Sequence, residues 1–404
     1  MKLKVLKFGG TSVGSKEAII RSASIITKWS KKYKVVAVLS AMSGETDRLI
    51  GLTKLFSKNP NPYDYDNAIS SGENVSCSLM SIYLNSTKIR SKSLMSWQIP
   101  ILTSEEHMKS RILKIDRNKI LKEFSKNDVL LIPGFQGINS KNENTTLGRG
   151  GSDTSAVAVA ASLDAECIIY TDVDGVYTTD PNLVKNAKKI SQISYEEMLE
   201  LASQGAKVLQ TRSVELAMRK KTKLSVRSSI KTNSTGTLVT DENSKLENNT
   251  VSGIAYSKDE AKITLSRVLD KPGVSSKIFS PLAKGNINVD MILQNVSQDG
   301  KYANLSFTLP RSDLEKALKI LKKEKPKIGY KRINSSNNIS KISVIGVGMR
   351  SHAGVAQTLF ETLGKSKINI QVITTSEIKI SILIDEQFTD LAVQKLHKAY
   401  KLHL

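Results

Sequence analysis

The chain has 404 residues, enough for two to four domains, and 39% of them are hydrophobic, which excludes wholesale disorder. Its 60 lysines and arginines outnumber 38 acidic residues, and the formal net charge is +22. The basic residues are spread along the chain and aromatic residues make up only 5%, so we expect no nucleic-acid partner. We interpret the positive net charge as a lysine-rich, solvated surface that also favours the binding of anionic substrates.

Cysteine and histidine usage excludes further classes of protein. Cys77 and Cys167 cannot form a disulfide framework, and Cys167 lies in an apolar run that predicts a buried position. The four histidines are scattered and give no zinc-binding spacing, so we expect no resident metal site. No apolar stretch reaches the ~18 residues of a membrane span, and Lys4 and Lys7 interrupt any secretory leader. We therefore expect a soluble, cytoplasmic protein with no membrane partner.

The first motif in the chain is KFGGTSVGS at residues 7–15, which follows a short apolar strand. Glycines let the backbone approach a ligand and turn its N–H groups toward it, and a neighbouring lysine suits phosphate. The lysine precedes the glycines, so this is not a Walker loop. A second run, GRGGSDTSA at residues 148–156, has Arg149 as its cation and Asp153 after it. Two such loops predict a phosphoryl-transfer enzyme of a non-Walker type.

Apolar runs followed by polar loops indicate the fold of this first part. They lie at residues 35–39, 129–132 and 168–170. Uninterrupted apolar strands predict a parallel sheet covered on both faces, with ligands at the carboxyl ends of the strands. Residues 154–163 are predicted to be a helix whose N-terminus can receive an anion. Ser194 and Glu197 form a capping box for a helix that ends near Ser203.

Beyond a polar, linker-like stretch at residues 240–249, the chain repeats itself. Residues 272–292 align without a gap with residues 353–373, and Gly354 stands 81 residues after Gly273. The period of 81 residues is too long for a solenoid repeat, and two copies are too few. Each copy has a strand, a glycine loop, a helix, a turn and further strands. This order predicts two tandem domains of the ferredoxin-like βαββαβ type.

Together these blocks resemble the aspartate kinases of the amino-acid kinase family, and the repeat resembles the paired ACT domains of those enzymes. The resemblance spans the whole chain in the family's order, through KFGGTSVGS, SGE at 71–73, GRGGSDTSA, and TDVDGVYTTDP at 171–181. It implies an α/β fold: a carbamate-kinase-like three-layer domain with a mainly parallel sheet over residues 1–245. ACT domains would follow at residues 246–335 and 336–404.

The family's activity would be transfer of the γ-phosphate of MgATP to the β-carboxylate of L-aspartate, giving ADP and L-4-aspartyl phosphate. This reaction opens lysine, threonine and methionine biosynthesis. A carboxylate with a reference pKa near ~4 is ionised at neutral pH, so no general base is needed. The protein must supply charge neutralisation and in-line positioning, while Mg²⁺ is carried with the nucleotide. The resemblance further implies a homodimer formed through the ACT domains.

By resemblance, Lys7 contacts the transferring phosphoryl group and Asp153 orients the lysine. Asp153 is also consistent with a helix N-terminal carboxylate that meets the helix dipole, and both roles can hold together. A guanidinium such as Arg149 would bind the α-carboxylate of aspartate, and Glu73 would bind its ammonium. The remaining substrate residues implied are Ser40, Thr46, Gly150, Gly151 and Ser152. The remaining nucleotide and catalytic residues implied are Gly9, Gly10, Thr171, Asp172, Tyr177, Asp180, Lys207 and Val208. Some relatives have His-Pro where this chain has Gln210-Thr211, next to Lys207. The segment DVDGV is also consistent with a simple Asp–Gly turn.

The repeats are expected to bind lysine or threonine as feedback inhibitors, although a dimerisation module without a ligand remains an alternative. Asp290 would bind the effector's ammonium, and the second copy has Gln371 at the aligned position. The effector residues implied are Asp270, Gly273, Val274, Asn288, Val289, Asp290, Gln294, Gly354, Val355, Asn369, Ile370 and Glu377.

Two other functions remain open at this point. A kinase acting on glutamate, acetylglutamate or a nucleotide would share the glycine loops, but Glu73 and the ACT-like repeat argue against it. An amino-acid sensor with an inactive kinase domain would have lost its charged residues. Lys7, Arg149, Asp153 and Lys207 are all present.

Overall fold

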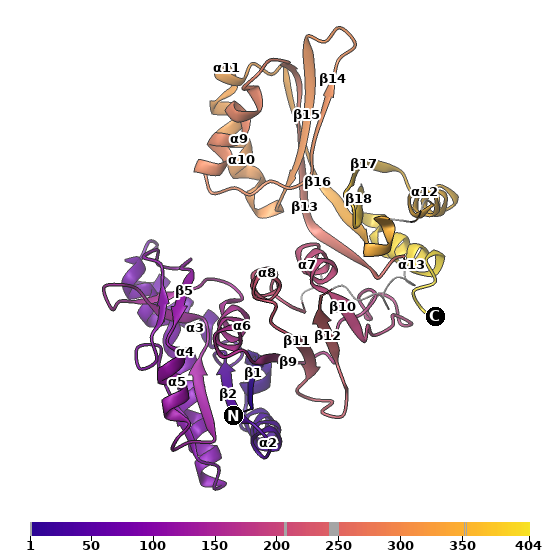
Figure 1. The fold of residues 1–404 in the computed structure, drawn as a ribbon. Coiled ribbons are helices and arrows are strands. Elements are labelled where there is room, and N and C mark those ends of the chain that lie inside the picture. Colours follow the sequence, from indigo (N-terminus) through magenta and orange to yellow (C-terminus); the bar gives the residue numbers. More distant parts are fainter. Residues whose placement is uncertain (1, 206–207, 242–249, 351, 353) are drawn as a thin grey trace. The chain divides into compact units, whose positions relative to one another are not determined.

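The computed structural model describes residues 2–205, 208–241, 250–350, 352 and 354–404 (Figure 1). The chain divides into two compact units. The first comprises Met1–Thr178 and Lys188–Glu247, and the second comprises Thr179–Ala187 and Asn248–Leu404. The predicted boundary between residues 245 and 246 lies outside the described residues. Within the described part, no helix is long and apolar enough to cross a membrane.

The first unit is built on an eight-stranded sheet with the order β10-β12-β11-β9-β1-β2-β6-β3. All its neighbouring strands are parallel except β11 and β12, as the apolar runs predict. The strands are β1 (Leu3–Phe8), β2 (Lys34–Leu39), β3 (Ser91–Ser93), β6 (Val129–Pro133), β9 (Glu166–Thr171), β10 (Gln192–Ser194), β11 (Leu224–Ser228) and β12 (Thr237–Thr240). A smaller sheet has the order β5-β4-β7-β8. Its strands are β4 (Ile101–Thr103), β5 (Ile112–Ile115), β7 (Gln136–Ile138) and β8 (Asn144–Thr146).

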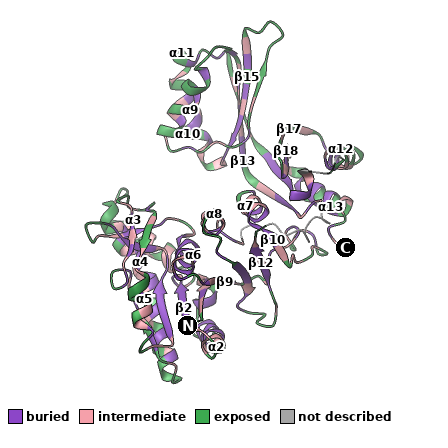
Figure 2. Ribbon diagram, viewed as in Figure 1, coloured by how far each residue is buried: buried purple, intermediate pink, exposed green. Residues whose placement is uncertain are grey.

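Helices cover both faces of the large sheet, whose strands are buried (Figure 2). On one face, Phe8 and Leu39 pack with residues of α2 (Lys16–Ser30) and α4 (Pro62–Ser86). On the other face, α6 (Gly151–Leu163) contacts β1, β2 and β9. The remaining helices are α1 (Gly10–Val13), α3 (Glu45–Phe56), α5 (Arg117–Glu123), α7 (Tyr195–Ser203) and α8 (Thr211–Lys220). The three-layer α/β fold is confirmed, and α7 follows the predicted capping box of Ser194 and Glu197.

The second unit is built on a six-stranded antiparallel sheet with the order β14-β15-β13-β16-β18-β17. Its strands are β13 (Gly253–Leu269), β14 (Ile292–Val296), β15 (Tyr302–Leu309), β16 (Arg332–Ile345), β17 (Ile370–Thr375) and β18 (Lys379–Asp385). Its helices are α9 (Val274–Lys284), α10 (Leu314–Lys323), α11 (Lys325–Ile328), α12 (Val355–Lys365) and α13 (Thr389–Ala399). Short 3-10 turns lie at η2 (Arg311–Asp313), η3 (Val347–Arg350) and η4 (Glu386–Phe388).

The internal repeat is visible in this unit. Helices α9 and α12 begin and end 81 residues apart, and each follows a glycine with positive φ, +87° at Gly273 and +105° at Gly354. The long strands β13 and β16 pair from Gly253 to Ser266 of β13, with two register shifts, and serve both repeats. One core contains Ile263 and Phe307, and the other contains Ile254 and Ile382. The two ferredoxin-like repeats therefore share one continuous sheet.

Candidate active site

Lys7 and Asp153 meet at the carboxyl end of β1. Residues alternate along a strand, so Lys7 points away from the face on which Phe8 packs and toward α6. Its Nζ lies 2.7 Å from Oδ1 of Asp153, in the first turn of α6, and the two side chains are 12% and 9% exposed. A cation is thereby held beside the Gly9–Gly10 turn. The structure brings together two residues that the motifs placed in separate loops, and their catalytic roles remain predictions.

The loops after β1, β2 and β6 are joined at the same edge. The Ser40 N–H donates to the Phe8 carbonyl at 3.0 Å, and the Gly134 N–H donates to the Leu39 carbonyl at 2.9 Å. A Cβ at Gly134 would lie 2.7 Å from the Cβ of Ser152, so only glycine lets the β6 loop approach α6 this closely. Ser40, on the loop after β2, and Ser152, in the first turn of α6, are thus linked through the β6 loop, as expected at the ligand-binding edge of a parallel sheet.

Glu73 is a buried carboxylate on α4 with only half of its oxygens satisfied. Its Oε1 accepts from the Ala41 N–H at 3.1 Å, whereas Oε2 has no partner among the described residues. The residue is 3% exposed. Burial raises the pKa of Glu73 to about 7, against the opposing effect of the Ala41 hydrogen bond. A buried oxygen left unpaired in this way can accept from a ligand or from an ordered water.

The glycine loop at residues 148–150 leads into the N-terminus of α6. Gly150 has φ +73°, and a Cβ there would lie 2.1 Å from Cγ of Gln210, so the position requires glycine. Gly151 and Ser152 are buried in the first turn of α6, and the Arg149 side chain is exposed. The first N–H groups of a helix and its dipole favour a negatively charged group here. Thr46 lies in the first turn of α3 and is half-buried.

The predicted nucleotide residues divide between the two units. Thr171 ends β9, a neighbour of β1, and its hydroxyl donates to Asp172 at 3.0 Å. The Tyr177 hydroxyl donates to Asp174 at 2.7 Å, and this hydrogen bond raises the pKa of Tyr177 to about 12. Asp180 belongs to the second unit, where its Oδ2 accepts from the Tyr256 hydroxyl at 3.0 Å.

The prediction for Lys207 lies outside the described residues, while the neighbouring Val208 is half-buried. Sequence reasoning also missed contacts at this edge. Ser12 donates to the Ser229 hydroxyl at 2.8 Å, and Ser229 donates to the Thr171 carbonyl at 3.1 Å, which ties the β1 turn to the end of β9. Ala41 acts through its backbone, so no side-chain pattern could have identified it.

Most of the predicted effector residues lie near the ends of α9, α12 and the strands beside them. Asp290 is ion-paired with Lys341, a 5% exposed residue of β16 whose Nζ also lies 2.9 Å from Glu260. Gln294 donates to Asp270 at 3.1 Å. Gly273 and Val274 open α9 as Gly354 and Val355 open α12, and Asn288 is exposed. Asn369 precedes β17, which begins at Ile370, and Glu377 lies in the turn before β18.

Comparisons with known proteins agree with this architecture. The model of the Amino acid kinase family matches residues 2–228, and the ACT domain model matches residues 266–324 and 342–400. An aspartate kinase of Pseudomonas putida is 48% identical over 405 residues, covering 100% of this chain and 98% of its own. The chain therefore belongs to the amino acid kinase family, in the group formed by the aspartate kinases with ACT domains.

Two solved structures share the fold along nearly the whole chain. Aspartokinase III of E. coli in complex with aspartate and ADP has a TM-score of 0.83 at 24% identity, with 99% of each chain covered. The same enzyme in complex with lysine and aspartate has a TM-score of 0.78 at 25% identity, covering 98% of this chain and 99% of that one. The resemblance drawn from the motifs is confirmed, and the chain is an ATP-dependent kinase.

Proposed function

We propose that the chain transfers the γ-phosphate of MgATP to the β-carboxylate of L-aspartate, giving ADP and L-4-aspartyl phosphate. The observation that carries this proposal is the buried, half-satisfied carboxylate of Glu73 near the glycine turns. An ammonium group of the acceptor would supply the missing donor. An acceptor with an amino group is favoured over a nucleotide acceptor for that reason.

The chemistry requires little more than placement and charge. An oxygen of the substrate β-carboxylate attacks the γ-phosphorus while the bond to the ADP oxygen breaks. Lys7 and the N–H groups of the Gly9–Gly10 turn and of α6 would stabilise the negative charge on the transferring group. Arg149, on its exposed loop, would bind the α-carboxylate, so the two ends of the amino acid would be held by opposite charges.

Magnesium is assigned to the nucleotide rather than to a protein cage. Among the described residues, no group of three or more His, Cys, Asp or Glu side chains could hold a metal ion. Mg²⁺ commonly keeps few protein ligands and binds substrate phosphates, where it would neutralise the β- and γ-oxygens.

We further propose that the reaction serves lysine, threonine and methionine biosynthesis in the cytoplasm, and that lysine and/or threonine inhibit it through the ACT domains. The complex of the E. coli relative with lysine supports an amino-acid effector. Homodimerisation through the ACT domains belongs to the same proposal. Turnover measured with each effector alone and with both together tests the regulatory part, and unchanged turnover in all three cases would contradict it.

The site of phosphorylation is tested by NMR of the product. With MgATP and aspartate labelled with ¹³C at the β-carboxyl, we expect a carbon signal split by phosphorus. Aspartate labelled at the α-carboxyl is the matched control and should show no splitting. Splitting of the α-carboxyl signal, or of neither, would contradict the proposed product.

A further inference from the structure

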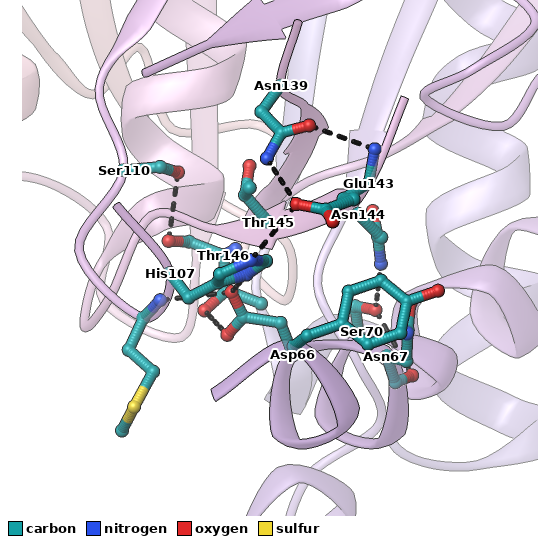
Figure 3. A network of polar contacts seen from close by, with 12 residues as sticks. Asp66, Asn67, Ser70, His107, Ser110, Asn139, Glu143, Asn144, Thr145 and Thr146 are labelled. Carbon is teal, nitrogen blue, oxygen red and sulfur yellow. Dashed lines mark hydrogen bonds and ion pairs between the residues drawn. The ribbon is translucent and has the colours of Figure 1, made fainter. Parts of the chain in front are cut away.

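A fully buried carboxylate outside the predicted set joins three segments of the first unit. Asp66 lies on α4, seven positions before Glu73, and is 0% exposed. Its Oδ1 accepts from the Thr146 hydroxyl at 2.6 Å, and its Oδ2 accepts from the N–H groups of Thr146 and Met108 at 3.0 and 2.9 Å. Figure 3 shows Thr146 beside the Asp66 carboxylate. These hydrogen bonds offset the cost of burying the polar side chain.

His107 extends the network toward the turn between β7 and β8. Its Nδ1 lies 2.9 Å from Oδ2 of Asp66, and its Nε2 lies 3.5 Å from Oε2 of Glu143. The Asn139 side chain in turn donates to that same Glu143 oxygen at 2.8 Å (Figure 3). Asn144 donates to the Ser70 hydroxyl of α4 at 2.6 Å. Helix α4 is therefore fixed to β8 at two points.

The partners of Asp66 lead directly to the Arg149 loop. Thr146 ends β8, and its carbonyl accepts from both the N–H and the hydroxyl of Ser110, at 3.0 and 2.9 Å. Arg212 of α8 donates to the carbonyls of Leu147 and Ser110, each at 2.8 Å. Ser110 and Arg212 thus anchor the backbone of Thr146 and Leu147, the two residues before Gly148. Arg149 is the first side chain beyond this anchored segment.

We propose that Asp66 is a positioning residue for the aspartate-binding half of the active site. It fixes the helix that carries Glu73 to the strand from which the Arg149 loop departs, and so sets the separation of the two groups that hold the amino acid. The inference rests on the proposed function. Asp66 is fully buried and would act only through the segments that it joins. A carboxylate is needed because only an acceptor without protons satisfies all the converging donors.

The residues predicted to bind the nucleotide lie apart from the Asp66 contacts. Thr171 and Asp172 follow β9, and none of the contacts made by Asp66 involves them. Loosening the Asp66 contacts should therefore weaken the binding of aspartate and leave the binding of ATP unchanged. A role in general stability would affect both substrates or neither.

The test uses a pair of substitutions at Thr146, because Asp66→Asn alone would place an amide beside buried N–H donors and can prevent folding. Thr146→Val removes the hydroxyl donor with little change in shape, and Thr146→Ser keeps it. Asp128→Asn is the control. Asp128 also pairs with basic residues, Lys34 at 2.7 Å and Arg90 at 2.9 Å, but it lies before β6, at the opposite end of that strand from the site.

We expect Thr146→Val to raise the KM for aspartate about tenfold, the scale of one hydrogen bond to a charged group, with the KM for ATP within about twofold. Thr146→Ser and Asp128→Asn should keep both KM values within about twofold of the wild type. Asp66→Asn should show the same selective effect if it folds. Thermal unfolding is recorded for every variant.

Equal changes in both KM values, or the same change in the Val and Ser variants, would overturn the positioning role. So would a lowered melting temperature with both KM values unchanged. The wild type is assayed first with aspartate, and a failure there counts against the proposed function. The variants are then compared on whichever amino-acid acceptor the wild type uses, so a missing selective effect still refutes the inference about Asp66 on its own.

Discussion

Replacement of Glu73 by glutamine should weaken the binding of aspartate in a protein that still folds. Glu73→Gln keeps the shape and the acceptor for the Ala41 N–H, but it removes the negative charge. The lost interaction is one between two charged groups in a buried site, for which we expect a cost of about 1.5–3 kcal/mol. The KM for aspartate should rise roughly 10- to 150-fold, while the KM for ATP stays within about twofold.

The pKa of Glu73 also predicts how the KM for aspartate depends on pH. At a pKa of about 7, roughly half of the molecules carry the ionised carboxylate at pH 7. The ionised fraction falls with pH, so the KM of the wild type for aspartate should increase about fivefold between pH 7 and pH 6. Glu73→Gln should abolish this pH dependence, because glutamine does not titrate.

As the pH rises, the stability of the wild type should fall while its affinity for aspartate increases. The folded-state pKa of Glu73 is raised from its usual value of 4.5, so the unfolded state loses its proton first as the pH rises. The glutamic acid therefore contributes stability below about pH 4.5 that is lost as the pH rises through about 7. Glu73→Gln should melt at a higher temperature than the wild type at pH 8.

The assay is steady-state turnover between pH 6 and pH 8, paired with thermal unfolding at the same pH values. Glu123→Gln is the control, since Glu123 forms an exposed pair with Lys92. That variant should retain the wild-type pH dependence. An unchanged KM for aspartate in Glu73→Gln, or a pH dependence that survives the substitution, would refute the role of Glu73 in binding the ammonium.

Three further predictions concern other parts of the chain. Lys7→Ala should abolish turnover while circular dichroism shows a folded protein, and substantial remaining turnover would exclude a role in phosphoryl transfer. Gly150→Ala should lower turnover and the melting temperature, because φ there is +73° and Gln210 blocks the added Cβ; wild-type values of both would contradict this. Asp290→Ala should weaken effector inhibition without changing uninhibited turnover, and full inhibition would remove Asp290 from the effector site.

The fold around the candidate site could be predicted because its signals are local. Each buried strand is an apolar run that ends in a glycine or serine loop, and parallel strands place such loops at one edge. Lys7 and Asp153 lie far apart in sequence, but each has a motif of its own that points to this edge. The repeat likewise predicted that α12 would follow a glycine as α9 does, and the structure confirms it.

The contacts between distant segments could not be predicted from the sequence. Asp66 has no motif, and its donor Thr146 lies 80 residues further along the chain. Asp180 is hydrogen-bonded to Tyr256, 76 residues further along the chain. The motif at residues 171–181 therefore gave no sign that Asp180 belongs to the second unit. The pairing of β13 with β16 could not be predicted either. The sequence pattern describes each repeat by itself, whereas this pairing joins the two copies.

The most direct test of the central claim traps the acyl phosphate with hydroxylamine in the presence of MgATP. L-Aspartate and L-glutamate are compared as acceptors, with the wild type and with Lys7→Ala. We expect the wild type to form hydroxamate from L-aspartate and none from L-glutamate, and Lys7→Ala to form none from either amino acid. Hydroxamate from L-glutamate at an equal rate, or none from either amino acid with folded wild-type protein, would contradict it.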